Sequence, residues 1–346
     1  MEHIMRRCFE LARNGEGRVA PNPMVGAVIV CAGQIIGEGY HARYGGPHAE
    51  LMAVNSVVDK SLLKKSTIYV SLEPCCHYGK TPPCAGLILE TGIPRVVVAA
   101  TDPNPQVNCG GIEMLRTNGV EVITGVLEDE TRELNRFFYT YHEKQRPYII
   151  LKWAESADGY IDIKRSPFEK PAQISCATSK VLAHRWRSQV QSIMAGTNTI
   201  LYDNPMLTAR NWAGNNPIRL VIDCNGRISP DAQVFNADAD TLLFVSKKQN
   251  KNYGANTTQI EADFDNIEEF ILNDLYQRKV QSLFIEGGAQ LINSFIRKGL
   301  WDEARIFISQ NTLGDGLKAP DKPSEQIKHL SIIGFDKLLV YRRNFL

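Results

Sequence analysis

Hydrophobic and polar positions in the first half of the chain change their period several times. Residues 1–17 have the pattern of an amphipathic helix that ends at glycine, and residues 24–40 that of a β-hairpin turning near Ala32 and Gly33. Short apolar runs and helix-like segments then follow in turn. We expect strands over 66–74, 95–103 and 120–127 and helices over 47–58, 82–92 and 110–119. This alternation predicts a mainly parallel sheet covered by helices.

The second half begins a new series that is led by a strand. We place the domain boundary near residues 144–147, because polar residues lead up to it and an apolar strand opens the segment 148–161. We expect helices over 179–191 and 289–299, a strand running into a helix over 192–201, and strands over 218–223, 241–246, 282–288 and 303–309. The pattern and the length of the chain predict an α/β fold with two domains, residues 1–145 and residues 146–346.

Charge and composition narrow the range of functions. The chain has 346 residues, and 39 basic against 38 acidic side chains leave a formal charge of +1, without the basic excess of nucleic-acid binders. The first segment carries Glu2 and lacks the apolar core of a signal peptide, and no apolar run is long enough to cross a bilayer. We therefore expect a cytoplasmic protein without nucleic-acid or membrane partners. The sequence does not decide between a monomer and a homo-oligomer.

Candidate chemistry is concentrated in residues 73–84, EPCCHYGKTPPC, and in an upstream pair, His48 and Glu50. Together they give the pattern H-x-E … P-C-x8-C. Imidazole and thiolate groups are preferred zinc ligands, and three of them leave the fourth position open for water, as in catalytic sites. His48, Cys75 and Cys84 would be the ligands, and zinc would lower the pKa of that water to about 7. Glu50 would pass the water's proton to a leaving amine.

Two other interpretations of these residues stay open. Cys75, Cys76, His77 and Cys84 would be enough for a structural zinc site, which would leave Glu50 without a role. A lone H-x-E also occurs by chance, and a single cysteine is often only a packed thiol. Zinc deaminases have the signature H-x-E … P-C-x-x-C, whereas eight residues separate the two cysteines here.

The longer pattern PCxHxGxTPPC, with PNPMVGAVIV before it, resembles the deaminase domain of the bifunctional riboflavin-biosynthesis deaminase/reductase family. The second half has LKWAESADGYI, HRWR, TILYDNPMLTAR and FIEGGAQL in the order of that family's reductase domain. The resemblance therefore covers nearly the whole chain. The motif of the first domain is highly specific, and those of the second are moderately specific.

For the first domain the resemblance implies a fold similar to cytidine deaminases. It implies removal of the 2-amino group of 2,5-diamino-6-(5-phosphoribosylamino)pyrimidin-4(3H)-one, with one zinc ion per chain on His48, Cys75 and Cys84 and with Glu50 as proton shuttle. The positions that match substrate contacts are Asn22, His41, His77 and Lys80. An ordinary solvated lysine at Lys80 and a structural role for His41 are the alternatives.

For the second domain the resemblance implies a fold similar to dihydrofolate reductase and reduction of the ribosyl group of 5-amino-6-(5-phosphoribosylamino)uracil to ribityl by NADPH. Two glycines before a helix can hold a phosphate at the helix N-terminus, and arginines have forked donors that match a phosphate. The implied cofactor contacts are Ala154, Thr199, Asp203, Gly287, Gly288 and Ala289. The implied substrate contacts are Lys152, Arg187, Leu207, Arg210 and Glu286. Arg187 as a helix-surface arginine and Asp158 as a turn residue are the alternatives.

This chain departs from the family pattern in the second domain. The family has S-L-D-G where residues 156–159 read Ser-Ala-Asp-Gly, and a Trp-Ile-Thr cluster where residues 173–175 read Gln-Ile-Ser. Pro171 stands where the family has a serine near the substrate. These departures raise the alternative of a deaminase whose reductase-like domain is inactive or structural. The retained Lys152 and Glu286 argue against it, and the neutral charge argues against an editing deaminase that acts on nucleic acid.

Overall fold

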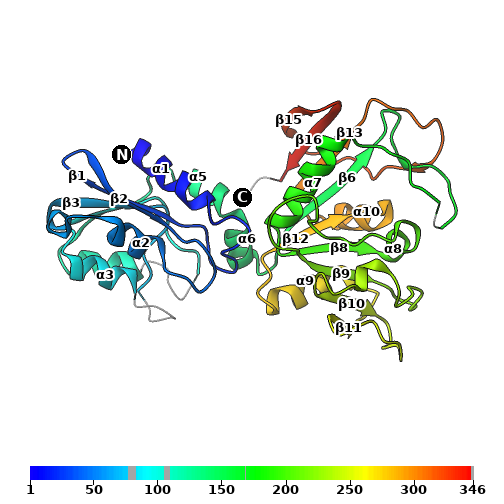
Figure 1. Cartoon of the computed structure of the whole chain (residues 1–346), viewed down its shortest axis with the longest axis horizontal. Helices are drawn as coiled ribbons and strands as arrows, with labels where there is room; N and C mark the ends of the chain where they lie inside the picture. Colours follow the sequence, from blue (N-terminus) through cyan, green and yellow to red (C-terminus); the bar gives the residue numbers. More distant parts are fainter. Residues whose placement is uncertain (77–82, 105–109, 168, 344–346) are drawn as a thin grey trace. The chain divides into compact units, whose positions relative to one another are not determined.

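The computed structural model describes residues 1–76, 83–104, 110–167 and 169–343 (Figure 1). The chain forms two compact units, Met1–Gln145 and Arg146–Leu346. In the described part of the chain, no helix has both the length and the apolar character that crossing a membrane requires.

The first unit is built on a five-stranded sheet, counted over its described residues. In spatial order the strands are β2 (Gln34–Tyr40), β1 (Gly26–Cys31), β3 (Ser66–Val70), β4 (Arg95–Val98) and β5 (Glu121–Ile123). β1 is antiparallel to both of its neighbours, whereas β3, β4 and β5 are parallel. The expectation of a mainly parallel sheet is therefore wrong for this unit. One of the two antiparallel pairings, between β1 and β2, is the predicted hairpin, in which Ala32 and Gly33 turn the chain with φ of 49° and 80°.

Helices cover both faces of this sheet. The helices are α1 (Glu2–Arg13), α2 (Ala49–Ser56), α3 (Cys84–Thr91), α4 (Gly110–Thr117), α5 (Glu128–Leu134) and α6 (Arg136–Lys144), with a short 3-10 helix at Lys60–Lys65. Ala27 and Ile29 of β1 pack with α2, α3 and α4, while Val28 between them packs on the opposite face with α1. α1 and α5 lie side by side on that second face (Figure 1). Alternate residues of β1 thus serve two cores, which makes a three-layer α/β/α unit.

The second unit is built on a nine-stranded sheet in the part that the structure describes. In spatial order its strands are β11 (Thr257–Glu261), β10 (Thr241–Val245), β9 (Ile218–Ile222), β8 (Ser192–Gly196), β12 (Ser282–Glu286), β6 (Tyr148–Glu155), β13 (Glu303–Ile308), β16 (Asp336–Arg342) and β15 (Ile327–Ile333). The strands from β11 to β13 are parallel, and β16 and β15 add an antiparallel edge. The strands β7 (Tyr160–Asp162) and β14 (Leu317–Lys318) pair separately.

Helices of the second unit also lie on both faces of its sheet. They are α7 (Ala177–Gln189), α8 (Thr197–Asp203), α9 (Ile267–Gln277) and α10 (Ala289–Arg297), with a 3-10 turn at Gln233–Phe235. α9 and α10 pack with the main apolar core. On the other face Trp186 of α7 stacks on Phe307, with ring centroids 5.3 Å apart, and meets the edge of Phe284. The predicted α/β class with two differently built units is confirmed.

Candidate functional site

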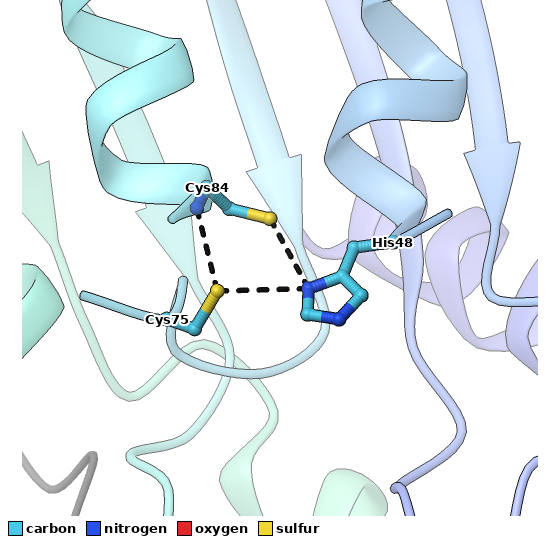
Figure 2. A group of neighbouring side chains, drawn as sticks. All are labelled: His48, Cys75 and Cys84. Atoms are coloured by element: carbon cyan, nitrogen blue, oxygen red, sulfur yellow. Dashed lines mark hydrogen bonds between the residues drawn. The ribbon is translucent and has the colours of Figure 1, made fainter. Parts of the chain in front are cut away.

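The sequence-predicted zinc ligands converge at the start of two helices. His48 is the residue before α2, Cys84 is the first residue of α3, and Cys75 lies in the loop after β3. His48 Nδ1 is 3.6 Å from Cys75 Sγ and 3.3 Å from Cys84 Sγ (Figure 2). The three ligand atoms all lie within 4.8 Å of one another. One detail differs from expectation, because His48 has extended backbone angles and precedes the first turn of its helix.

The chemistry and spacing of these atoms fit a zinc ion. Tetrahedral zinc with bonds of about 2.0–2.3 Å places neighbouring ligand atoms about 3.5–3.8 Å apart. The backbone N–H of Cys84 donates to Cys75 Sγ at 3.3 Å, which stabilises a thiolate. The hydrogen bond between the two thiols lowers the pKa of Cys75, with help from His48, and the same bond and burial raise the pKa of Cys84. The pair therefore shares a proton, and Cys75 is the sulfur that carries the negative charge, which is the form that binds zinc.

Glu50 lies on the first turn of α2 beside this cluster. Only 3% of the residue is exposed. Burial, and then the nearby Cys75, raises the pKa of its carboxyl group to about 7. The side chain also interacts with Cys84. A buried carboxyl group next to candidate zinc ligands is suited to accept and return a proton.

Asn22 and His41 form a hydrogen-bonded pair next to His48. Asn22 Nδ2 donates to His41 Nε2 at 3.1 Å, so His41 Nδ1 carries the proton and donates to the carbonyl of Pro47 at 2.9 Å. The rings of His41 and His48 meet edge to face, with centroids 5.5 Å apart. Burial lowers the pKa of His41, which favours the neutral ring. Both predicted residues therefore lie at the cluster, where His41 fixes the residue before His48.

Cys76 lies away from the ligand cluster. Its Sγ packs against Gly110, where an added Cβ would come within 2.6 Å of the sulfur. Among the described residues the candidate metal cluster consists of His48, Cys75 and Cys84. His77 and Lys80 lie outside the described residues. Of the alternative ligand set of three cysteines and His77, the described part thus brings together Cys75 and Cys84 but not Cys76.

Glu73 is a supporting residue that the sequence reasoning missed. The residue is 4% exposed, and its carboxylate accepts backbone N–H groups from Asp102, Gly111 and Ile112 at 3.1–3.3 Å. The start of α4 approaches the same loop so closely that a Cβ at Gly111 would lie 1.8 Å from the carbonyl oxygen of Pro74. The acid before Pro-Cys and the later Gly-Gly pair were visible signals, but only the fold brings them together.

A second polar cluster lies on the α7 face of the larger sheet. Lys152 of β6 and Glu286 of β12 are direct neighbours in register, and Lys152 Nζ is 3.8 Å from Glu286 Oε2. Arg187 of α7 pairs with the same carboxylate through Nε and Nη2, at 2.8 and 2.7 Å. Burial works to raise the pKa of Glu286, but the charges of Arg187 and Lys152 outweigh it and hold that pKa at about 2. Glu286 is therefore the carboxylate that Lys152 and Arg187 share.

His184 and Thr208 belong to the same cluster and were not predicted. Arg187 Nη1 donates to the carbonyl oxygen of Thr208 at 3.0 Å. His184 is 6% exposed, and burial together with the charges of Arg187 and Arg210 lowers its pKa to about 4. Leu207, the residue before Thr208, is buried with a φ of 53°, while Arg210 is exposed. The structure therefore brings the predicted Arg187, Leu207 and Arg210 to one region.

The predicted cofactor contacts lie on β6, in the turn from β12 to α10 and on α8, where Asp203 is the last residue. Gly287 and Gly288 follow β12 with φ of 89° and 65°, and Ala289 begins α10. An added Cβ at Gly287 would lie 2.9 Å from the side chain of Thr199 on α8, so the position requires glycine. Ala154 lies on β6 opposite Phe307. This arrangement offers backbone N–H groups at a helix start, which suits a phosphate.

The departures from the family pattern lie at a pocket and at a turn of the second unit. Residues 173–175 line a pocket of about 390 Å³ together with Cys176, Ser309, Gln310, Asn311, Phe335 and Asp336. Asp158 accepts bonds from Ser156 Oγ and the backbone N–H groups of Leu313 and Gly314, which is the turn role that the sequence left open.

Two family descriptions match the chain. Residues 1–100 match the cytidine and deoxycytidylate deaminase zinc-binding region, and residues 147–337 match the RibD C-terminal domain. The riboflavin biosynthesis protein RibD of Aquifex aeolicus is 36% identical, over 99% of this chain and 98% of its own. That of Bacillus amyloliquefaciens is 39% identical, over 92% and 86%.

Solved structures agree with these matches. The diaminohydroxyphosphoribosylaminopyrimidine deaminase/5-amino-6-(5-phosphoribosylamino)uracil reductase of Thermotoga maritima has a TM-score of 0.90 and 37% identity, over 99% of this chain and 98% of its own. RibD of Acinetobacter baumannii has a TM-score of 0.88 and 29% identity, with the same coverage.

Proposed function

The chain belongs to the RibD family, as a bifunctional riboflavin-biosynthesis enzyme with a deaminase and a reductase domain, and from that premise we propose its substrates, cofactors and catalytic residues. The first domain hydrolyses the 2-amino group of 2,5-diamino-6-(5-phosphoribosylamino)pyrimidin-4(3H)-one. The second reduces the ribosyl group of 5-amino-6-(5-phosphoribosylamino)uracil to ribityl. Both substrates are small molecules, and the enzyme acts in the cytoplasm.

The cluster of His48, Cys75 and Cys84 beside the buried Glu50 is the observation that carries the deaminase proposal. These three residues would hold one zinc ion per chain, and the ion would supply an activated water by lowering its pKa to about 7. Glu50 accepts a proton from the attacking water and gives it to the 2-amino nitrogen as the C–N bond breaks, while the second proton of the water passes to the ring nitrogen beside C2. Water and the amine thus become a carbonyl group and ammonia. Asn22, His41 and the residue at position 77 contact the substrate, and the lysine at position 80 contacts its phosphate.

The cluster of Lys152, Arg187 and Glu286 supports the reductase proposal. The glycine pair with Ala154, Thr199, Asp203 and Ala289 would hold NADPH, which would supply the hydride for the ribosyl C1′. Lys152 gives a proton to the ring oxygen as the C1′–O4′ bond breaks. Burial lowers the pKa of Lys152, which makes its ammonium group a better acid. Arg187 and Arg210 hold the substrate phosphate, Leu207 lies beside them, and Glu286 contacts the ribosyl group.

One experiment tests both halves. Purified protein is incubated with the diaminopyrimidine phosphate, with and without NADPH, and the products are identified by mass. We expect the deaminated ribosyl product without NADPH and the ribityl product with it. Deamination without any reduction would replace the proposal by a deaminase with an inactive second domain, for which residues 171 and 173 are the first places to look.

A further inference from the structure

Arg165 has an unusual set of partners for an arginine outside any helix or strand. It follows β7, and its side chain is 3% exposed. Nε donates to Asp162 Oδ2 at 2.6 Å, and Nη1 donates to the carbonyl oxygens of Glu169 and Tyr202 at 2.9 and 3.0 Å. Nη2 donates to Asp203 Oδ1. Because an arginine has five N–H groups, this side chain is almost fully used inside the protein and is not a free cation for a ligand.

Asp162 joins the two ends of the same segment. Its Oδ1 accepts the backbone N–H groups of Ile163 and Ala172, both at 2.9 Å, while Oδ2 pairs with Arg165. Asp162 and Arg165 together therefore fix the base of the segment 163–176, apart from residue 168, which lies outside the described residues. The segment ends at Cys176, where α7 begins. It carries Gln173, Ile174 and Ser175, which line the 390 Å³ pocket.

The other partners of Arg165 come from the carboxyl end of α8. Tyr202 and Asp203 are the last two residues of this helix, and the Arg165 guanidinium also lies over the Tyr202 ring, 5.8 Å from its centroid. Thr199, four residues before Asp203, contacts the Gly287 position at the other end of α8. Residues four apart share one face of a helix, so this face is bounded by the glycine pair at one end and by Arg165 at the other.

We propose that Arg165 is a positioning residue of the reductase site, which fixes the segment 163–176 to α8 and holds the Asp203 carboxylate on the face that receives the cofactor. The inference rests on the proposed reductase function. Asp203 uses Oδ1 for Arg165 and retains a second oxygen for a hydroxyl group of the cofactor. The Arg165 guanidinium orders both the loop and the Asp203 carboxylate, so the site is in place before the cofactor binds.

The test compares Arg165→Met with Lys164→Met. Lys164 is the adjacent residue of the same segment and also pairs with a carboxylate, Asp315 at 2.7 Å, but their side chains are 69% and 72% exposed. Exposed pairs contribute little, so Lys164→Met is a matched control. Amide hydrogen exchange of Ile163 and Ala172 is measured without ligand, and NADPH affinity is measured by calorimetry. KM for NADPH and kcat of reduction are measured separately.

In Arg165→Met we expect the two amides to exchange at least about tenfold faster and the NADPH Kd and KM to rise about tenfold, with a smaller change in kcat. Lys164→Met should match the wild type in all of these. Arg165→Lys should lie between the two, because one ammonium cannot satisfy both carboxylates and both carbonyl oxygens. If Arg165→Met does not fold, Arg165→Lys decides by the same measurements.

Exchange and NADPH affinity equal to those of Lys164→Met would overturn the proposal. Faster exchange with unchanged NADPH affinity would also overturn it, since Arg165 would then order the segment without serving the site. If the wild type itself binds no NADPH, the proposed reductase function fails, and the exchange comparison still decides whether Arg165 holds the segment.

Discussion

Arg187 and Glu286 form a two-point ion pair, with Nε to Oε1 at 2.8 Å and Nη2 to Oε2 at 2.7 Å. Both residues are predicted to contact the same substrate, one at its phosphate and the other at its ribosyl group. A phosphate that binds Arg187 therefore has to accept hydrogen bonds from N–H groups that Glu286 does not occupy. The ion pair also holds both side chains in place before the substrate binds. Because Lys152 shares Glu286, the three charges form one connected unit and not three separate contacts.

Metal content distinguishes the three proposed ligands from the neighbouring thiol. We expect wild-type protein washed with chelator to retain about one zinc per chain, and Cys75→Ser or Cys84→Ser to lose it, because each removes one of three protein ligands. Cys76→Ser is the matched control and should retain zinc, since its sulfur packs against Gly110. Metal analysis of the four proteins is the measurement. Loss of zinc in Cys76→Ser as complete as in Cys84→Ser would show that the ligands are wrongly assigned.

Glu50→Gln separates metal binding from proton transfer. The amide has nearly the shape of the carboxyl group but cannot carry a proton, so we expect zinc to remain and deamination to fall by roughly 10²–10⁴-fold or more. Ammonia release and zinc content are measured on the same preparation. Near-normal ammonia release would exclude Glu50 as the proton shuttle.

Arg210→Ala tests whether the two activities can be separated. The lost contact with phosphate is charge-assisted, worth about 1.5–3 kcal/mol, so the substrate KM of reduction should rise by about tenfold or more. Deamination should be unchanged, because the predicted deaminase residues all precede residue 145. NADPH oxidation at several concentrations of deaminated substrate is measured beside ammonia release. Equal losses in both reactions would contradict the assignment of Arg210 to reduction alone.

His184 gives a prediction about pH. Its folded pKa of about 4 is below the ordinary value of 6.5, so the unfolded chain takes up a proton first and folding loses stability as pH falls from 6.5 to 4. The full shift corresponds to about 3 kcal/mol. Asparagine does not titrate, so the free energy of unfolding of His184→Asn does not fall for this reason. The difference in free energy of unfolding between the wild type and His184→Asn should therefore decrease as pH falls from 6.5 to 4. Urea unfolding at several pH values measures this, and a constant deficit would contradict the assigned pKa.

Sequence reasoning succeeded where the signal is local. The Ala32-Gly33 turn, the helix that begins at Cys84 and the left-handed Gly92 that ends it all follow from neighbouring residues. It failed for the antiparallel β15 and β16, because their pairing at the edge of the sheet depends on contacts with β13 that no local pattern encodes.

The same division holds for the sites. The zinc cluster could be predicted because its ligands are of the types that zinc prefers and match a specific motif, and the described geometry brings the three together. The role of Glu73 could not be predicted, because its hydrogen-bond partners at Gly111 and Ile112 lie 38 and 39 residues away along the chain. Arg165 was missed for the same reason: its Asp203 partner is 38 residues away.

The contact of Glu73 with the start of α4 links metal retention to the stability of a helix that supplies no ligand. When the loop that carries Cys75 moves, the three hydrogen bonds from backbone N–H groups to the buried Glu73 carboxylate must break. The helix also packs directly on this loop at Gly111. We therefore expect the loop and α4 to open as one cooperative unit. The rate at which zinc escapes would then be set by how often that unit opens, so a substitution on the outer face of α4 could shorten the residence time of a metal that it never touches.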